Sequence, residues 1–203
     1  MRVIVIAAVW LMSLSLGGCQ NLPQSFSTLD PRLHPDQAAY EESIAPYLLR
    51  LEVYEGPATA ILAHILPLTK AVRQAQALRQ AAAHDMDAEH LAALVSEGQA
   101  EAEAYLDIML SIFTPAAADR KISGPNPTWR IFLLLDGGGQ LEPLRVEEIT
   151  ARQRNALLQT FYPYWGYWDS LYRLRFPLPL EGREAAVVVS GPQGRAQSPL
   201  KLD

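Results

Sequence analysis

Short apolar runs that end at glycine or proline are the feature that most constrains this fold. Residues 59–66 are apolar and close at Pro67, residues 129–135 close at an aspartate followed by three glycines, and residues 185–190 close at Gly191. Runs this short suit β-strands, whereas helices usually need at least ~10 residues. We therefore predict a chain built mainly from strands.

Two further runs fit either a strand or a helix. Residues 47–54 alternate over part of their length but also place Tyr47, Leu51 and Tyr54 at helical spacing. The Gly56-Pro57 break after them favours a hairpin with residues 59–66. Residues 105–113 either continue a preceding helix or form a strand, and we favour the strand slightly. The fold prediction depends on these two assignments.

A helical pair is predicted over about 69–103. Thr69 is placed to cap a first helix whose apolar residues follow a helical period, and a second helix begins near Asp87. The two helices should form an αα-hairpin inserted between strands.

The rest of the chain supplies more strands and one short helix. The glycine run after Asp136 predicts a hairpin turn into a strand over 141–149, and Thr150 with Gln153 predicts a capping box that opens a short helix. Strands are expected over 167–176 and 185–190, with a loose tail after Gly191. With six or seven strands in all, we expect an α+β, mainly β, sandwich-like domain over 36–203, of which the immunoglobulin-like sandwich is one form.

Composition and charge narrow the function classes. The chain is 49 % hydrophobic and 19 % charged, as globular proteins are, and its formal net charge is −5. Lysines and arginines are scattered. Because nucleic-acid binding needs a clustered positive surface, we expect no nucleic-acid partner.

The first residues have the character of a signal peptide. Met1 and Arg2 form a short positive start, and residues 3–16 are apolar apart from two serines. This stretch is shorter than the ~20 apolar residues that a membrane-spanning helix needs. We therefore predict an export signal.

The run Leu16-Gly17-Gly18-Cys19 resembles the lipobox of bacterial lipoproteins. The resemblance implies a signal peptide over 1–18, cleavage between Gly18 and Cys19, and a diacylglycerol with further acyl chains such as palmitate on Cys19. Cys19 is the only cysteine, so acylation would consume a thiol that has nothing to pair with. Residues 19–35 then form a lipid-anchored tether, and Gln20 favours the outer membrane.

Aromatic side chains crowd into residues 161–172. They form either a stacking platform for a sugar, peptide or lipid, with Tyr164, Trp165 and Trp168 as its candidate residues, or part of the core. We favour the core, since each ring buries ~150 to 250 Å².

Other constellations have structural explanations. His84 and His90, with the carboxylates between them, lie where helix ends favour such charges, so we predict no metal. We find no catalytic motif and expect no cofactor and no enzyme activity. A hydrolase would need a histidine within reach of both a serine and a carboxylate.

These features lead to one functional expectation and one alternative. We expect an outer-membrane lipoprotein, with its domain in the periplasm, that binds an envelope protein or takes part in envelope assembly; the alternative is a small-ligand-binding lipoprotein. The order of a tryptophan strand, a helix and the Tyr172-x-x-x-Phe176-Pro177 strand also loosely resembles uncharacterised bacterial lipoproteins.

Overall fold

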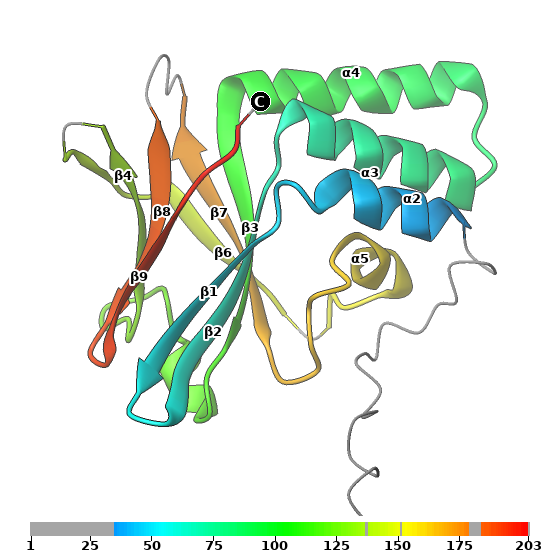
Figure 1. Cartoon of the computed structure of the whole chain (residues 1–203). Helices are drawn as coiled ribbons and strands as arrows, with labels where there is room; N and C mark the ends of the chain where they lie inside the picture. The colour runs from blue at the N-terminus through cyan, green and yellow to red at the C-terminus, as the bar shows by residue number, and fades with distance from the viewer. Residues whose placement is uncertain (1–34, 137, 151, 179–183, 203) are drawn as a thin grey trace, which may run out of the picture.

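The computed structural model describes residues 35–136, 138–150, 152–178 and 184–202. Within them nine strands form two antiparallel sheets (Figure 1). Sheet A has the order β1-β2-β3-β7-β6 and consists of β1 (Leu49–Glu55), β2 (Ala58–Pro67), β3 (Tyr105–Phe113), β7 (Ser170–Pro177) and β6 (Arg145–Ile149). Sheet B has the order β5-β4-β8-β9 and consists of β5 (Gln140–Leu141), β4 (Arg130–Leu135), β8 (Ala185–Gly191) and β9 (Gly194–Pro199).

The main core is made from residues of both sheets. Alternate residues of β3 belong to it, namely Leu106, Ile108, Leu110 and Ile112, and each is at most 4 % exposed. They lie in one cluster with Leu133 and Val187 of the other sheet and with Trp129, which directly precedes β4. This alternation is the pattern of a sandwich, so the predicted α+β, mainly β, sandwich-like class is confirmed.

The opposite face of sheet A is buried too, because helices cover it. A second apolar cluster joins Met109 of β3 and Leu171 of β7 to α2 (Pro35–Ile44), α3 (Lys70–Ala83) and α5 (Ala156–Phe161). Figure 1 shows these three helices side by side next to the sheet, with α4 (Ala88–Ala104) lying along α3. The two polar groups described below, around Asp169 and Asp107, lie on or beside this helix-covered face.

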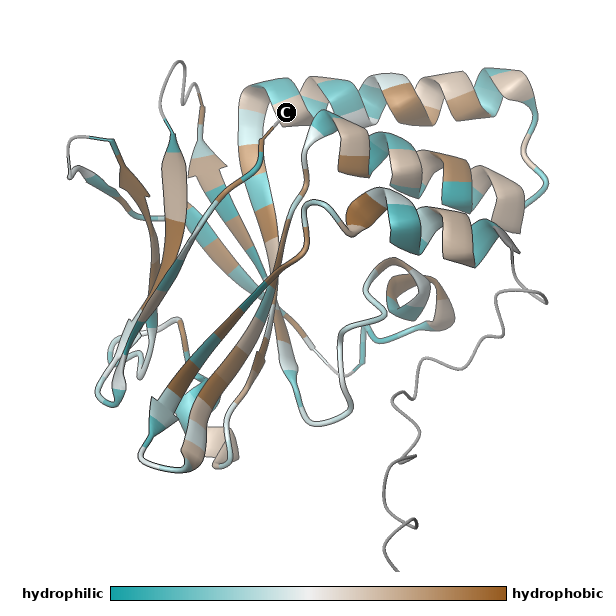
Figure 2. Ribbon diagram, in the orientation of Figure 1, coloured by the Kyte–Doolittle hydropathy of each residue, from teal (hydrophilic) through white to brown (hydrophobic). Residues whose placement is uncertain are grey.

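The predicted helical pair is confirmed as α3 and α4. Thr69 Oγ1 accepts a hydrogen bond from Val72 N at 3.2 Å, and Asp87 Oδ1 accepts one from His90 N at 2.9 Å. No residue of α4 is fully buried, and Figure 2 shows mixed polar and apolar residues along it. The hairpin connects β2 to β3, which are neighbours in sheet A, so it interrupts the chain without interrupting the sheet.

Both ambiguous runs are strands, but helix α2 and strand β9 were not predicted. Helix α2 begins at Pro35, the last residue of the expected tether, in a segment to which no helix was assigned, and it is fixed by the buried side chains of Gln37, Tyr40 and Ile44. The tail after Gly191 is not loose, because β9 pairs with β8 from Gly194 to Pro199. Tertiary contacts and backbone pairing, which leave no periodic apolar pattern, specify both elements.

Three boundaries were also wrong. The expected strand over 141–149 is split, because β5 pairs in sheet B and β6 pairs in sheet A. Thr150 and Gln153 do form a hydrogen-bonded pair, but α5 begins later, with Asn155 as its N-cap. The strand expected from Tyr167 begins at Ser170, which leaves the residues before it in a loop.

Candidate functional site

The structure separates the three aromatic residues that the sequence singled out. Trp165 is 5 % exposed and belongs to the helix-side cluster, and Tyr164 packs beside that cluster. Trp168 is 67 % exposed. A platform built from all three side chains would need each of them to be partly exposed around one concavity, and only Trp168 is widely exposed. Gly18 and Cys19 lie outside the described residues.

Trp168 belongs to a short segment that we call the aromatic loop, residues 165–169, between α5 and β7. It presents a second ring that sequence reasoning did not select, since Tyr167 is 79 % exposed. The rings of Tyr167 and Trp168 meet edge to face, with centroids 4.9 Å apart and an interplanar angle of 87°. Figure 1 shows the α5–β7 connection at the end of the molecule opposite α4.

The base of the aromatic loop is fastened by Asp169. Its Oδ2 accepts hydrogen bonds from Gly166 N at 2.9 Å and from Ser111 Oγ at 2.9 Å, and Ser111 is fully buried on β3. The Trp165 indole N–H also donates to the Asp169 carbonyl at 3.2 Å. A Cβ added to Gly166 would lie 3.0 Å from Asp169 Oδ2, so the turn is tight enough to favour glycine there.

Arg154 holds the same base from the other side. Its guanidinium donates to the carbonyls of Trp165 at 3.0 Å and Gly166 at 3.3 Å, and it lies 4.5 Å from the centroid of the Trp165 ring. A planar cation that stacks on a ring while bonding two carbonyls leaves little freedom to the backbone between them. The loop therefore combines a fixed base with two exposed rings.

His64 lies near the base of the aromatic loop. With Ser111 and Asp169 it forms a group of one histidine, one serine and one aspartate. It pairs across the strands with Ser111, and its ring centroid lies 5.7 Å from that of Tyr164. Burial lowers the pKa of His64, and the nearby Asp169 carboxylate opposes this shift only in part. Among the described residues no hydrogen bond joins His64 to Ser111 or Asp169. Ser111 donates directly to Asp169, which is not the order in which a histidine activates a serine.

A second polar group, which we call the arginine cluster, lies farther along the same face. It consists of Asp107, Glu101, Arg73, Arg173 and Arg175, drawn from β3, α4, α3 and β7. The fully buried Asp107 Oδ2 accepts from Arg73 at 2.8 Å, Arg173 at 2.7 Å and Arg175 at 2.8 Å, while its Oδ1 accepts from Arg175 Nε at 2.7 Å.

The three guanidiniums that bond the Asp107 carboxylate determine its protonation state. Burial alone would raise the pKa of Asp107, but the hydrogen bonds from Arg175 and Arg173 outweigh it and hold the pKa below its usual range. Glu101 supplies a second anion, bonded to Arg73 and 3.5 Å from Arg173. The cluster thus ties four elements together by charge. The feature of the sequence that could have revealed the arginine cluster is Asp107, a charged residue within the otherwise apolar run of residues 105–113.

The other sequence candidates have ordinary positions. Asp87 caps α4 and is 2.8 Å from His90 Nδ1, and both side chains are exposed. Over residues 35–136, 138–150, 152–178 and 184–202, no three His, Cys, Asp or Glu side chains gather in a way that would hold a metal ion. A shallow groove of about 140 Å³ lies between α2 and α3, lined by Tyr40, Leu78 and Arg79 among others.

Fold and site together define a two-sheet β-sandwich with a helical layer on one sheet. The chain resembles the crystal structure of a novel protein of unknown function from Burkholderia pseudomallei, with a TM-score of 0.45 and 12 % identity over 82 % of this chain and 84 % of that chain. No family model and no curated protein matches the chain. In the described part of the chain, none of the helices has the length and apolar character to cross a bilayer.

Proposed function

We propose that this protein is a lipid-anchored component of the bacterial envelope, attached through Cys19, whose sandwich domain acts by binding. The observation that carries the proposal is the run Leu16-Gly17-Gly18-Cys19, which follows a positively charged start and an apolar stretch. Two or more acyl chains on one residue anchor a protein stably, at ~0.8 kcal/mol for each buried methylene. The domain then needs no membrane-spanning helix of its own.

The position of the first described helix supports this arrangement. Helix α2 begins at Pro35, so residues 20–34 separate it from the proposed anchor. Fully extended, such a segment reaches at most ~55 Å. Gln20 directly after the cysteine favours transfer to the outer membrane, and we propose that the domain faces the periplasm.

A binding role is supported by the aromatic loop. Exposed tryptophan and tyrosine side chains are enriched at interfaces, including those with membranes, because each combines an apolar ring with one polar group. Here the loop's base is fixed by Asp169 and Arg154 while its rings stay exposed.

The anchor is tested by expressing the full chain in a Gram-negative host and determining its amino-terminal mass. Cys19→Ser is the matched control, since it replaces only the sulfur. We expect wild-type protein in the membrane fraction, beginning at an acylated Cys19, and unacylated Cys19→Ser protein. Wild-type protein that keeps residues 1–18, or that carries a free thiol, would overturn the proposal.

The binding role is tested by crosslinking in intact cells. Wild-type and Cys19→Ser proteins are captured, and the attached proteins are identified by mass spectrometry. An envelope protein captured only with the anchored form supports assembly at the membrane. If the anchored protein is recovered alone, a stable assembly role is wrong.

Small-ligand binding remains the second candidate, and the exposed Tyr167–Trp168 pair favours it. Because Trp165 is buried, the platform would consist of two rings rather than the three expected from the sequence. Titrating sugars and peptides against tryptophan emission tests it, with Trp168→Phe as the control. Absence of any Trp168-dependent change would remove this candidate.

A further inference from the structure

The aromatic loop presents exposed rings on a fixed base. The side chains of Tyr167 and Trp168 are 79 % and 67 % exposed, yet the residues on either side of them are fastened to the fold. Asp169 bonds Gly166 and the buried Ser111, and Arg154 bonds the carbonyls of Trp165 and Gly166. The rings are therefore held outward by their supports.

The chemistry of the two rings indicates what they contact. Tyrosine and tryptophan each combine an apolar body with one polar group, and they concentrate at membrane surfaces, where one end is apolar and the other is wet. Side chains of both types therefore suit the headgroup layer of a bilayer.

The small size of the pair argues against a protein partner at this position. Two largely exposed rings offer roughly 300 Å², whereas a stable protein interface buries ~800 Å² on each side. The other large apolar side chains exposed in the described residues lie on other elements, for example Leu78 on α3 and Leu144 between β5 and β6. A bilayer needs no matching surface around the rings.

The proposed lipid anchor explains how so small a contact could hold the domain at the membrane. Two rings alone bind a membrane weakly, but a domain tethered through Cys19 stays within ~55 Å of the lipid surface. Tethering turns the second contact into an intramolecular one, so weak intrinsic affinity is enough.

We propose that the aromatic loop docks the anchored domain on its own bilayer, with Tyr167 and Trp168 in the headgroup layer. Docking fixes which end of the sandwich faces the membrane. The end with the α5–β7 connection lies toward the lipid, and α4 and the described carboxyl-terminal residues lie away from it (Figure 1). This inference rests on the proposed lipid anchor.

The test uses the full chain as a Gram-negative host produces it, purified in detergent and reconstituted into phosphatidylethanolamine and phosphatidylglycerol vesicles. If its amino-terminal mass shows acylation, it is used directly. If the thiol is free, the only cysteine is coupled to a maleimide lipid in the same vesicles. The loop is thus tested whether or not the host acylates Cys19, and failure of the anchor is seen separately in the mass.

The measurement is quenching of tryptophan emission by lipids brominated next to the headgroup. Because Trp129 and Trp165 are buried, Trp168 is the described tryptophan that such lipids can reach. When residues 1–18, and with them Trp10, are absent from both proteins, we expect quenching in the wild type and none in Trp168→Phe. If those residues are retained, Trp10 is first replaced by Phe in every variant.

A second measurement makes the result quantitative. Cys19→Ser protein that lacks residues 1–18, and so carries neither lipid nor apolar leader, is mixed with the same vesicles, and its partition is measured by sedimentation. We expect Tyr167→Ala/Trp168→Ala to lower the partition about tenfold or more, a factor that corresponds to ~1.4 kcal/mol. Leu144→Ala should leave it unchanged, since Leu144 lies beside Arg175, at the far end of β7. Absence of Trp168 quenching in the anchored protein overturns the proposal, as does equal partition of the double variant.

Discussion

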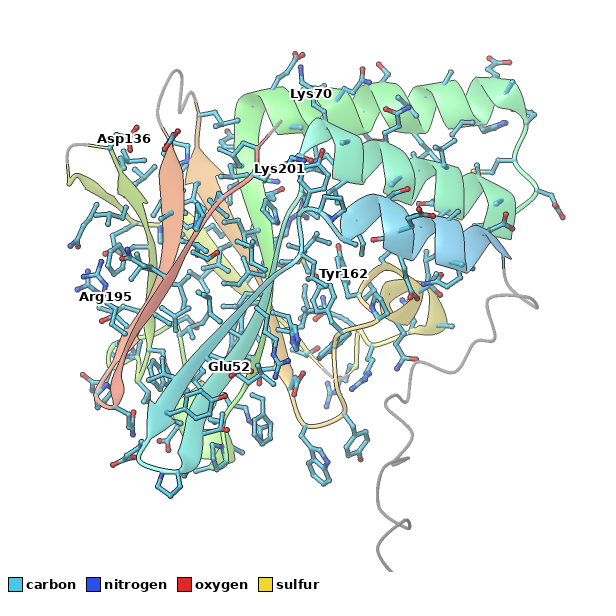
Figure 3. All side chains as sticks on the ribbon, in the orientation of Figure 1. Glu52, Lys70, Asp136, Tyr162, Arg195 and Lys201 are labelled. Carbon is cyan, nitrogen blue, oxygen red and sulfur yellow. The ribbon has the colours of Figure 1, made fainter. Side chains whose placement is uncertain are left out.

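Two aspartates lie at different points along the helix-covered face of sheet A, and their surroundings differ in charge. Asp107 accepts hydrogen bonds from three arginines, contributed by α3 and β7. Asp169 accepts from two neutral donors, the backbone of Gly166 and the hydroxyl of Ser111. Figure 3 shows how densely side chains fill the space between this sheet and the helices, where the labelled Tyr162 lies.

The different surroundings of Asp107 and Asp169 give the two aspartates different structural roles. Asp107 joins elements that are distant in sequence, so its loss should weaken the whole fold. Asp169 closes one tight loop, so its loss should change the loop more than the fold. The ring pair beyond Asp169 makes few contacts and should matter least for stability. These three levels are each testable.

The largest effect is expected from Asp107→Asn. Removing this carboxylate leaves guanidiniums in a buried site without their anion, which typically costs ~3 to 5 kcal/mol. For a domain of this size, that lowers the midpoint of thermal unfolding by about 10 °C. Circular dichroism measures it. Asp87→Asn is the matched control, because asparagine caps a helix as well as aspartate does. A loss below about 1 kcal/mol at Asp107 would show that water replaces the carboxylate.

The contribution of Asp107 to the free energy of unfolding should also depend on pH. Because the pKa of Asp107 is lower in the folded chain than its ordinary value near 3.9, its contribution is fully present above that value. The contribution is lost as the pH falls through the lower folded pKa. The difference in unfolding free energy between wild type and Asp107→Asn should therefore shrink in strongly acidic solution.

A smaller effect is expected from Asp169→Asn. Both donors bond the same carboxylate oxygen, Oδ2, and the neutral amide oxygen that replaces it accepts more weakly than a charged one, so a loss of ~1 to 2 kcal/mol is expected. Time-resolved anisotropy of Trp168 emission should fall faster, because the loop base is looser. Asp85→Asn is the control, since Asp85 is exposed and its φ of 50° is one that asparagine tolerates well. Unchanged anisotropy would show that Arg154 alone fixes the loop.

The sequence predicted these two regions unequally. Alternation marked residues 105–113 as a strand with one buried face, but the second buried face depends on helices that cover it. The arginines that bond Asp107 lie at positions 73, 173 and 175, and only the observed strand register brings Asp107 opposite Arg175. No local pattern carries that information.

The aromatic segment was recognised by composition but not by position. Trp165 is buried and Trp168 exposed because β7 begins at Ser170, while the apolar pattern extended the strand back to Tyr167. A shift of three residues in a boundary decides which rings enter the core. Such boundaries are set by Asp169 and its long-range bond to Ser111, which a single sequence does not reveal.

His64 predicts a weaker, pH-dependent effect beside the same loop. Burial lowers the pKa of His64, so the folded chain holds its proton less firmly than the unfolded chain does. Its contribution to stability is therefore complete above about 6.5 and declines as the pH falls below that value. His64→Gln should flatten the dependence of unfolding free energy between about pH 7 and 5. His84→Gln, the same change at an exposed position, is the matched control.

The smallest effect on stability is expected from Trp168→Phe. Its comparison with Trp165→Phe distinguishes an exposed ring from a ring that supports the loop. Trp168 is 67 % exposed, so the change should alter the unfolding free energy by less than about 0.5 kcal/mol. Trp165→Phe makes the same chemical change three residues earlier, where the indole donates to Asp169 and stacks on Arg154. It should cost more, about 1 to 2 kcal/mol. Urea unfolding of both variants checks the pair. Equal losses would mean that Trp168 packs against the fold in solution and is not free to contact a membrane or a ligand.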